Sequence, residues 1–252
     1  MAGMILNIAA YHFVAIDDPQ ALADALLARA QAAGLRGTLL VAPEGLNLFL
    51  AGQEQAVRGF VQALRAEPGL ARIALKESWS EAVPFARLKA KVKPEIITFR
   101  HPGSEPLGRE RAPAVTPQAL ARWLDQGHDD AGKPVVLLDT RNEEEVGHGS
   151  FAGALTLPIT DFTQLPEALA PHRDALADAT VVSFCTGGVR CEKAALWMHD
   201  TGMANVLQLE GGILGYFEQV GGRHYDGACF VFDQRVALTP DLRPVRDGPS
   251  LR

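Results

Sequence analysis

The sequence predicts a chain of two domains, an N-terminal α+β domain and a C-terminal α/β domain with a parallel sheet. In the first half, the apolar patterns follow the order strand, helix, strand, strand, helix. A segment rich in proline and glycine then interrupts the pattern between residues 102 and 117. Beyond it, wholly apolar runs of strand length alternate with helical patterns, as in a parallel sheet that is covered on both faces.

Size and composition agree with this prediction. The 252 residues suffice for two ordinary domains, and 47% hydrophobic with 21% charged residues is typical of globular chains. No apolar run reaches membrane-spanning length, and the first ten residues lack the basic stretch of a secretory signal, so we expect a cytoplasmic protein without a membrane partner. Three cysteines are too few for a disulfide framework or a four-cysteine metal site.

The first domain is predicted over 1–102 as a ferredoxin-like split β-α-β fold. Its first helix follows Asp17-Asp18-Pro19 and ends at Gly34, and Ala42-Pro43-Glu44-Gly45 suits a hairpin turn. A last strand between Arg72 and Phe99 would complete the fold. The other expected elements are strands over 11–16, 38–41 and 46–50 and helices over 20–33 and 53–66.

A basic stripe falls in that last strand region, where Arg87, Lys89, Lys91 and Lys93 alternate with apolar residues. In an extended strand all four cations share one face. Residues 1–102 hold 11 basic and 9 acidic residues, whereas 103–252 hold 13 and 21, so a polyanion would favour the first domain. The stripe is either a solvated outer face or a phosphate-binding surface.

The second domain is predicted over 116–224, after a linker over 103–115 and before a C-terminal tail over 225–252. A helix begins at Thr116-Pro117 and continues through Leu124. Three buried strands are expected over 134–138, 181–184 and 206–209. Because parallel α/β sheets place active sites at the carboxyl ends of strands, the residues that follow these strands are candidates for the site.

One of these segments, Cys185-Thr186-Gly187-Gly188-Val189-Arg190, has the composition of an anion-binding loop. Its glycines allow successive backbone N–H groups to converge on one point. The N-terminus of the following helix and Arg190 add positive charge, which lowers the pKa of a cysteine thiol. Cys185 is therefore predicted to be a nucleophile at neutral pH, and a buried inert cysteine fits this context poorly.

The second domain resembles rhodanese domains. The matching segments besides the Cys185 loop are Leu138-Asp139-Thr140-Arg141, Glu145-Val146-Gly147-His148, Gly153-Ala154 and Leu157-Pro158. The resemblance implies that Cys185 carries a persulfide, that Arg190 and the amides of 186–189 stabilise its charge, and that Asp139 and Arg141 support the loop. The cysteine-to-arginine spacing is that of sulfur-handling loops rather than of the longer phosphatase loops.

A narrower resemblance, over about residues 8 to 240, is to the tRNA uridine hydroxylase family. It rests on the segments 185–194, 209–213, 230–235 and 42–47 together with the basic stripe. It implies hydroxylation of carbon 5 of the wobble uridine in tRNA with molecular oxygen as co-substrate. It also makes tRNA the partner of the stripe, and a sulfur or electron donor protein a further partner. Many members continue into a cysteine-rich extension that this sequence, ending at Arg252, does not contain.

Cofactor signals are few. The sequence has no glycine-rich dinucleotide motif for flavin or nicotinamide, and no metal site is predicted. His128-Asp129-Asp130 has the spacing of an iron-oxygenase pair, but coincidence is the better explanation. Glu145 and His148 are expected to make structural hydrogen bonds. Cys191 could resolve an oxidised Cys185 or simply face the core.

Two alternative functions remain from other classes. A plain sulfurtransferase would need only the Cys185 loop, and a noncatalytic tRNA-binding module would use only the stripe. The intact cysteine and arginine argue against the second alternative. The substrate tRNAs, the electron donor and the oligomeric state stay open.

Overall fold

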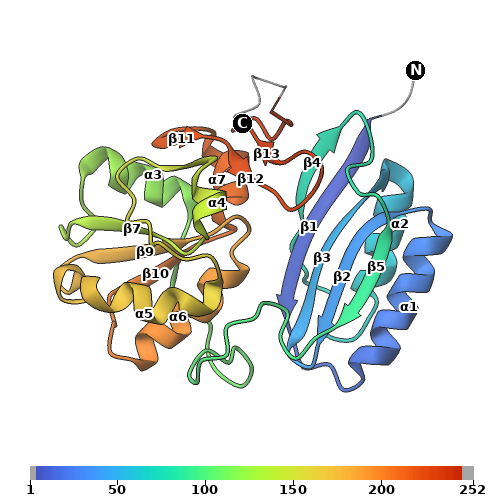
Figure 1. The fold of residues 1–252 in the computed structure, drawn as a ribbon, viewed down its shortest axis with the longest axis horizontal. Helices are drawn as coiled ribbons and strands as arrows, with labels where there is room; N and C mark the ends of the chain where they lie inside the picture. Colours follow the sequence, from blue (N-terminus) through green and yellow to red (C-terminus); the bar gives the residue numbers. More distant parts are fainter. Residues whose placement is uncertain (1–3, 246–252) are drawn as a thin grey trace. The chain divides into compact units, whose positions relative to one another are not determined.

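The computed structural model describes residues 4–245, which divide into two compact units, one ending at Thr98 and the other beginning at Phe99 (Figure 1). Within that range no helix is long and apolar enough to cross a membrane. Each unit has its own sheet and its own buried apolar cluster.

The first unit is a five-stranded sheet with two helices packed on one face (Figure 1). The strand order is β4-β1-β3-β2-β5, and neighbouring strands are antiparallel except for the parallel pair β2 and β5. The element bounds are β1 Ile5–Phe13, α1 Pro19–Ala32, β2 Arg36–Ala42, β3 Gly45–Gln53, α2 Glu54–Arg65, β4 Lys76–Ser80 and β5 Leu88–Val92.

This order confirms the predicted ferredoxin-like arrangement and adds one strand to it. The sequence predicts a single last strand between Arg72 and Phe99, whereas β4 and β5 both form in that segment, at opposite edges of the sheet. β4 completes the split β-α-β fold by pairing with β1. Its sequence, Lys76-Glu-Ser-Trp-Ser80, has little apolar alternation because an edge strand needs only one paired neighbour and tolerates polar residues.

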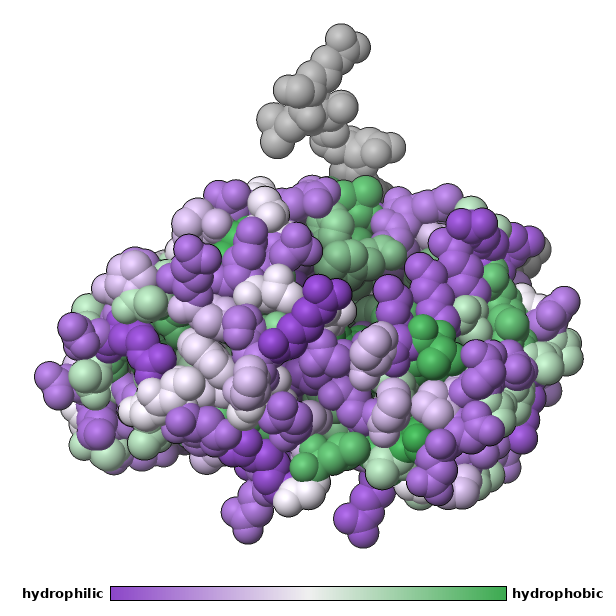
Figure 2. Space-filling view, turned by 60° about the horizontal axis from the view of Figure 1, so that its bottom comes forward, coloured by the Kyte–Doolittle hydropathy of each residue, from purple (hydrophilic) through white to green (hydrophobic). Residues whose placement is uncertain are grey.

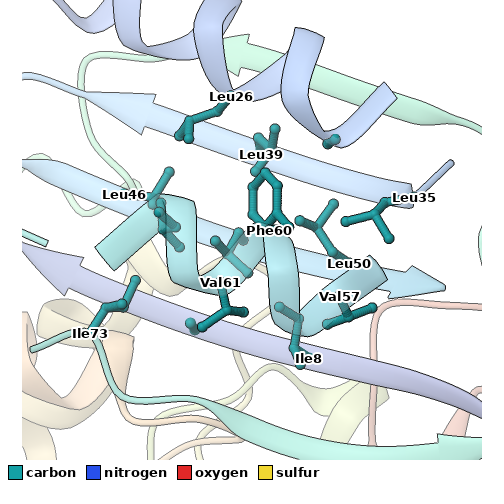
Figure 3. Packing of buried hydrophobic residues seen from close by; sticks show 14 of the residues in the cluster. Ile8, Leu26, Leu35, Leu39, Leu46, Leu50, Val57, Phe60, Val61 and Ile73 are labelled. Carbon is teal, nitrogen blue, oxygen red and sulfur yellow. The ribbon is translucent and has the colours of Figure 1, made fainter. Parts of the chain in front are cut away.

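The core of the first unit lies between the sheet and its two helices. Leu46 and Leu50 of β3 are fully buried, and Figure 3 shows them packed with Leu26 of α1 and Phe60 and Val61 of α2. Alternate residues of each strand therefore face the helices, as the period of two requires.

The basic stripe follows the same alternation. Leu88 in β5 packs against the core, so Lys89 and Lys91 of the same strand project from the opposite face. Arg87, Lys91 and Lys93 are exposed and Lys89 is half-buried.

The second unit is built on a four-stranded parallel sheet of order β6-β10-β9-β7, as predicted for an α/β domain. Helices α3 and α7 cover one face, and α5 and α6 cover the other (Figure 1). The element bounds are β6 Ala114–Val115, α3 Pro117–Gln126, β7 Val135–Asp139, α4 Glu143–Val146, β8 Gly149–Phe151, α5 Leu165–Leu169, β9 Thr180–Phe184, α6 Val189–Asp200, β10 Val206–Leu209 and α7 Gly212–Val220, with 3-10 helices at Phe162–Gln164, Ala170–His172 and Asp174–Leu176.

The segment predicted as a tail over 225–252 is structured as far as the described residues extend, to 245. It forms β11 Tyr225–Gly227, β12 Cys229–Phe230 and β13 Ala237–Leu238, and β11 pairs with β8. Tyr225 and Leu238 belong to the buried cluster of the second unit. The strands are too short for a periodic pattern to predict them, and they form because they cover that cluster. The rest of the predicted tail, 246–252, lies outside the described residues.

Large apolar side chains that remain exposed are few in the described range, among them Phe232 and Val236. On the face that Figure 2 shows, hydrophilic residues cover most of the surface and hydrophobic groups lie between them.

Candidate active site

The Cys185 loop connects the carboxyl end of β9 to the N-terminus of α6. Strand β9 is buried along its whole length and ends at Phe184, and α6 begins at Val189. Gly188 precedes the helix with a φ of 102°, in the left-handed region that favours glycine. The loop thus turns within a few residues and directs the Cys185 side chain at the helix N-terminus, where amide groups have no partners within the helix.

The sulfur of Cys185 lies against those amides. The Gly188 amide donates a hydrogen bond to Cys185 Sγ at 3.1 Å. The backbone amides of Arg190 and Cys191 also donate to this sulfur. An anionic sulfur at this position therefore interacts with several N–H groups and with the positive end of α6.

The N-terminus of α7 fixes the other side of the loop. The amides of Ile213 and Leu214 donate to the carbonyl oxygens of Cys185 and Thr186 at 2.9 and 3.0 Å. A Cβ atom at Gly212 would lie 2.5 Å from the Cys185 oxygen, and its φ is 62°. Only glycine fits there, so the Gly211-Gly212 pair that follows β10 belongs to the architecture of the site.

Arg190 points to a carboxylate within the site. Its Nη1 and Nη2 atoms lie 2.5 and 2.6 Å from the two carboxylate oxygens of Glu145, in a bidentate pair that is almost fully buried. Thr186 Oγ1 donates to the same carboxylate at 3.2 Å. Glu145 is held in place by α4, where it forms a capping box with Asn142. The pair therefore fixes the guanidinium beside the loop.

Asp139 and Arg141 form a second buried ion pair at the carboxyl end of β7. Arg141 Nη2 lies 2.7 Å from Asp139 Oδ2, and both side chains have no exposed surface. Asp139 also accepts from Ser150 Oγ at 2.8 Å, and Arg141 donates to the Gly149 oxygen at 2.7 Å. These bonds connect the end of β7 to β8, so Asp139 and Arg141 stabilise the strands around the loop.

Cys191 lies on the first turn of α6, beside the Cys185 sulfur. The two cysteine side chains are hydrogen-bonded to each other, and neither has exposed surface. Thr140 Oγ1 is 3.6 Å from Cys191 Sγ. Cys191 is buried, as expected of a residue that faces the core, and its position beside Cys185 leaves its resolving role a prediction.

The environment separates the acidities of the two thiols. Burial alone would raise the pKa of Cys185, but the Cys191 thiol, the charge of Arg190 and the backbone amides outweigh it and lower the pKa to about 5. Burial, followed by the hydrogen bond with Cys185, raises the pKa of Cys191 well above its usual value. Cys185 is then the thiolate at neutral pH, and Cys191 is the thiol that donates to it.

We expect an ultraviolet titration of the reduced protein to show one thiolate appearing near pH 5. Burial raises the pKa of Cys229 to about 12 and the pKa of Cys191 is also raised, so only Cys185 should titrate between about pH 4 and pH 8. The Cys185→Ala variant should lack this step. A first thiolate that appears only near pH 8.5, roughly the value of an unperturbed cysteine, would contradict the electrostatic account of the loop.

Comparisons with known proteins agree with this architecture. Residues 5–96 match the UPF0176 acylphosphatase like domain, and residues 116–219 match the Rhodanese-like domain. The tRNA uridine(34) hydroxylase of Xanthomonas campestris pv. campestris (strain B100) is 64% identical over 98% of this chain and 97% of that protein. This chain belongs to the tRNA uridine(34) hydroxylase family. The hydroxylases of that name from Xanthomonas euvesicatoria pv. vesicatoria (strain 85-10) and Xylella fastidiosa (strain 9a5c) are 62% and 59% identical, each over 97% of this chain and over 98% and 95% of their own length.

In this member of the tRNA uridine(34) hydroxylase family, two residues of the site were not predicted from the sequence. Glu145 was expected to make only a structural hydrogen bond, yet it pairs with Arg190. Gly212 enters the sequence prediction only within the segment 209–213 that carries the family resemblance, yet a Cβ atom at this position would lie 2.5 Å from the Cys185 oxygen. Its Gly-Gly pair after a parallel strand was the available signal, since such pairs permit close backbone approach.

The remaining candidates take other positions. Arg87, Lys89, Lys91 and Lys93 belong to the first unit, whereas the Cys185 loop belongs to the second. In His128-Asp129-Asp130, the Asp129 carboxylate accepts from the amide groups of Ala131 and Lys133 and from Thr180 Oγ1. That carboxylate therefore closes a turn, which agrees with coincidence as the reason for the iron-oxygenase spacing.

Proposed function

We propose that this protein hydroxylates carbon 5 of the wobble uridine of tRNA in an oxygen-dependent reaction that needs Cys185. The observation that carries the proposal is a cysteine whose pKa is lowered to about 5, in a rhodanese-type loop, in a chain whose full-length relatives are named tRNA uridine(34) hydroxylases. The loop supplies a nucleophilic sulfur and amides that stabilise negative charge on it.

The loop also suits a persulfide as an accessory or intermediate state of Cys185. A persulfide is an anion at neutral pH, and the Gly188 amide and the helix N-terminus stabilise an anion at this position. In the proposed site Thr186, Gly187, Gly188 and Val189 form the cradle, Arg190 supplies charge, and Asp139 and Arg141 support the surrounding strands.

The test uses cells that lack every other route to the modification. The intact gene should restore 5-hydroxyuridine and its derivatives in tRNA under air, as measured by nucleoside mass spectrometry, and should not restore them without oxygen. Restoration at equal levels without oxygen would reject the oxygen dependence. No restoration under air would reject the proposed reaction.

We propose residues 1–102 as the tRNA-binding domain, joined by 103–115 to the catalytic domain over 116–224. The basic stripe supports this assignment because Lys89 and Lys91 alternate along β5 with Leu88 and Ala90, which pack against the core, and therefore face away from the helices. Residues 1–102 also carry a net positive charge, whereas the remainder of the chain is acidic. Phosphate contacts from such a surface give affinity without base specificity.

Replacing Lys89, Lys91 and Lys93 by Ala should weaken tRNA binding and reduce its dependence on salt. Up to about three phosphate contacts would be lost, so the slope of log affinity against log salt should become shallower by roughly 2 to 3. Binding titrations at several salt concentrations measure this. A matched control replaces Arg29, Arg58 and Arg65, which lie on α1 and α2 and change the charge of the unit equally. Equal slopes for both variants would identify the stripe as a solvated face.

A sulfurtransferase that takes sulfur from thiosulfate or another persulfide is the second candidate. The same anion-stabilising loop at Cys185 favours it, since sulfur transfer requires only a stabilised persulfide. Brisk thiosulfate turnover by the purified protein, together with no 5-hydroxyuridine in the complementation test, would make sulfur transfer its activity.

A further inference from the structure

Cys185 has a second thiol within hydrogen-bond contact, which is a feature beyond an activated single cysteine. Cys191 lies on the first turn of α6, and the Gly188 amide that immediately precedes this helix is 3.1 Å from Cys185 Sγ. Both cysteines are fully buried, and their side chains interact. Thr140 contacts the segments that carry both sulfurs. Thr140, 3.6 Å from Cys191 Sγ, also donates through its amide and hydroxyl groups to the Phe184 oxygen, immediately before Cys185.

We propose that Cys185 and Cys191 form a dithiol that supplies the two electrons of the hydroxylation and becomes a disulfide once per turnover. This inference rests on the proposed oxygen-dependent function. It assigns to Cys191 a catalytic role, because its sulfur contacts the reactive sulfur and forms a bond with it.

The electron balance of the reaction requires a two-electron donor, which a dithiol can be. Hydroxylation places one atom of molecular oxygen on carbon 5 and releases the other as water, which needs two electrons from outside the uridine. The O–O bond, the C5–H bond and the Cys191 S–H bond break, while the C5–O bond and the S–S bond form. The protons from carbon 5 and Cys191, with one from solvent, complete the product hydroxyl and the water.

The contact geometry also suits the return to the reduced state. Thiol–disulfide exchange with an external thiol converts the Cys185–Cys191 disulfide back to the Cys185 thiolate and the Cys191 thiol. A cellular thiol reductant, either a small molecule or a protein, would attack the disulfide, and two of its thiols would become oxidised as Cys185 and Cys191 are released. The protein would then need an external thiol for repeated turnover but not for a single one.

The test is a single-turnover reaction of the full chain. The protein is reduced, freed of reductant, mixed in air with excess unmodified tRNA, quenched with acid and analysed by nucleoside and peptide mass spectrometry. We expect about one 5-hydroxyuridine per protein at most, matched by one Cys185–Cys191 disulfide, with further turnover only after dithiothreitol is added. Product that forms while both cysteines remain reduced would overturn the inference.

Two variants separate electron donation from hydrogen bonding. Cys191→Ser keeps a donor to the Cys185 thiolate, and Cys191→Ala removes it. If Cys191 supplies electrons, both variants should lose product by at least roughly tenfold, while Cys191→Ser should keep most of the Cys185 thiolate signal. High activity in Cys191→Ser with loss only in Cys191→Ala would reduce Cys191 to a positioning residue and overturn the inference.

The design distinguishes this inference from the function on which it rests. An unaltered protein that forms 5-hydroxyuridine without a disulfide rejects the dithiol alone. An unaltered protein that forms no 5-hydroxyuridine, with or without dithiothreitol, rejects the proposed function and the dithiol together.

Discussion

Replacing Cys185 by Ala is expected to abolish tRNA hydroxylation while leaving tRNA binding intact. The variant removes the sulfur that the Gly188 amide and the α6 N-terminus stabilise. Loss of a group that forms bonds during the reaction costs on the order of 10⁴-fold or more in rate. The side chain is small and buried, so the free energy of unfolding should fall by only about 1 kcal/mol. Nucleoside mass spectrometry, tRNA-binding titrations and urea unfolding measure the three quantities.

Ser183→Ala is a matched control for this experiment. Ser183 is buried on β9, the strand that ends just before Cys185, where its hydroxyl donates to the Leu207 oxygen at 3.2 Å. Its loss should cost about 1 kcal/mol of stability, comparable to the loss in Cys185→Ala, and leave hydroxylation largely intact. Full hydroxylation by Cys185→Ala would show that the sulfur takes no part in the reaction.

Of the substitutions considered, Arg190→Ala should lower the free energy of unfolding most. It should also raise the pKa of Cys185. The variant leaves the Glu145 carboxylate buried without its bidentate partner, which costs about 3–5 kcal/mol in comparable pairs. It also removes a charge that lowers the pKa of Cys185, so the thiolate should appear at higher pH. Urea unfolding and the ultraviolet titration measure the two effects separately.

The double variant Arg190→Ala with Glu145→Gln tests the cause of the instability. It removes both charges, so it should be more stable than Arg190→Ala alone, although the pKa of Cys185 should remain raised. Equal stability of the single and double variants would show that the unpaired carboxylate is not the cause.

The pH dependence of Arg190→Ala provides a further check. In the unaltered protein burial raises the pKa of Glu145, but Arg190 outweighs burial and lowers it. The native pair therefore contributes stability above the unfolded pKa of Glu145 and loses it as the pH falls. Without Arg190 the buried carboxyl has a raised pKa, so the variant should regain stability relative to the unaltered protein as the pH falls from about 7 to about 5.

Short segments limited the prediction of the fold from sequence. The apolar patterns that become α1, α2 and β9 are found close to their predicted bounds. β1 begins at Ile5 rather than at Tyr11, because its first residues are almost continuously buried and do not alternate. β4, β11, β12 and β13 have between two and five residues each, too few for a periodic signal.

The sequence by itself determined the chemistry of the site: a cysteine after a buried strand, glycines in the loop and an arginine six residues into the motif. These features are local, because strand, loop and helix N-terminus follow one another along the chain. Only the tertiary structure decided which groups surround the sulfur. Three residues from other parts of the chain complete its surroundings: Glu145 pairs with Arg190, Thr140 contacts Cys191 Sγ, and Gly212 lies against the Cys185 backbone oxygen. The contact of Cys191 with Cys185 depends on how α6 packs against β9, and the spacing of six residues is compatible with either orientation of its side chain.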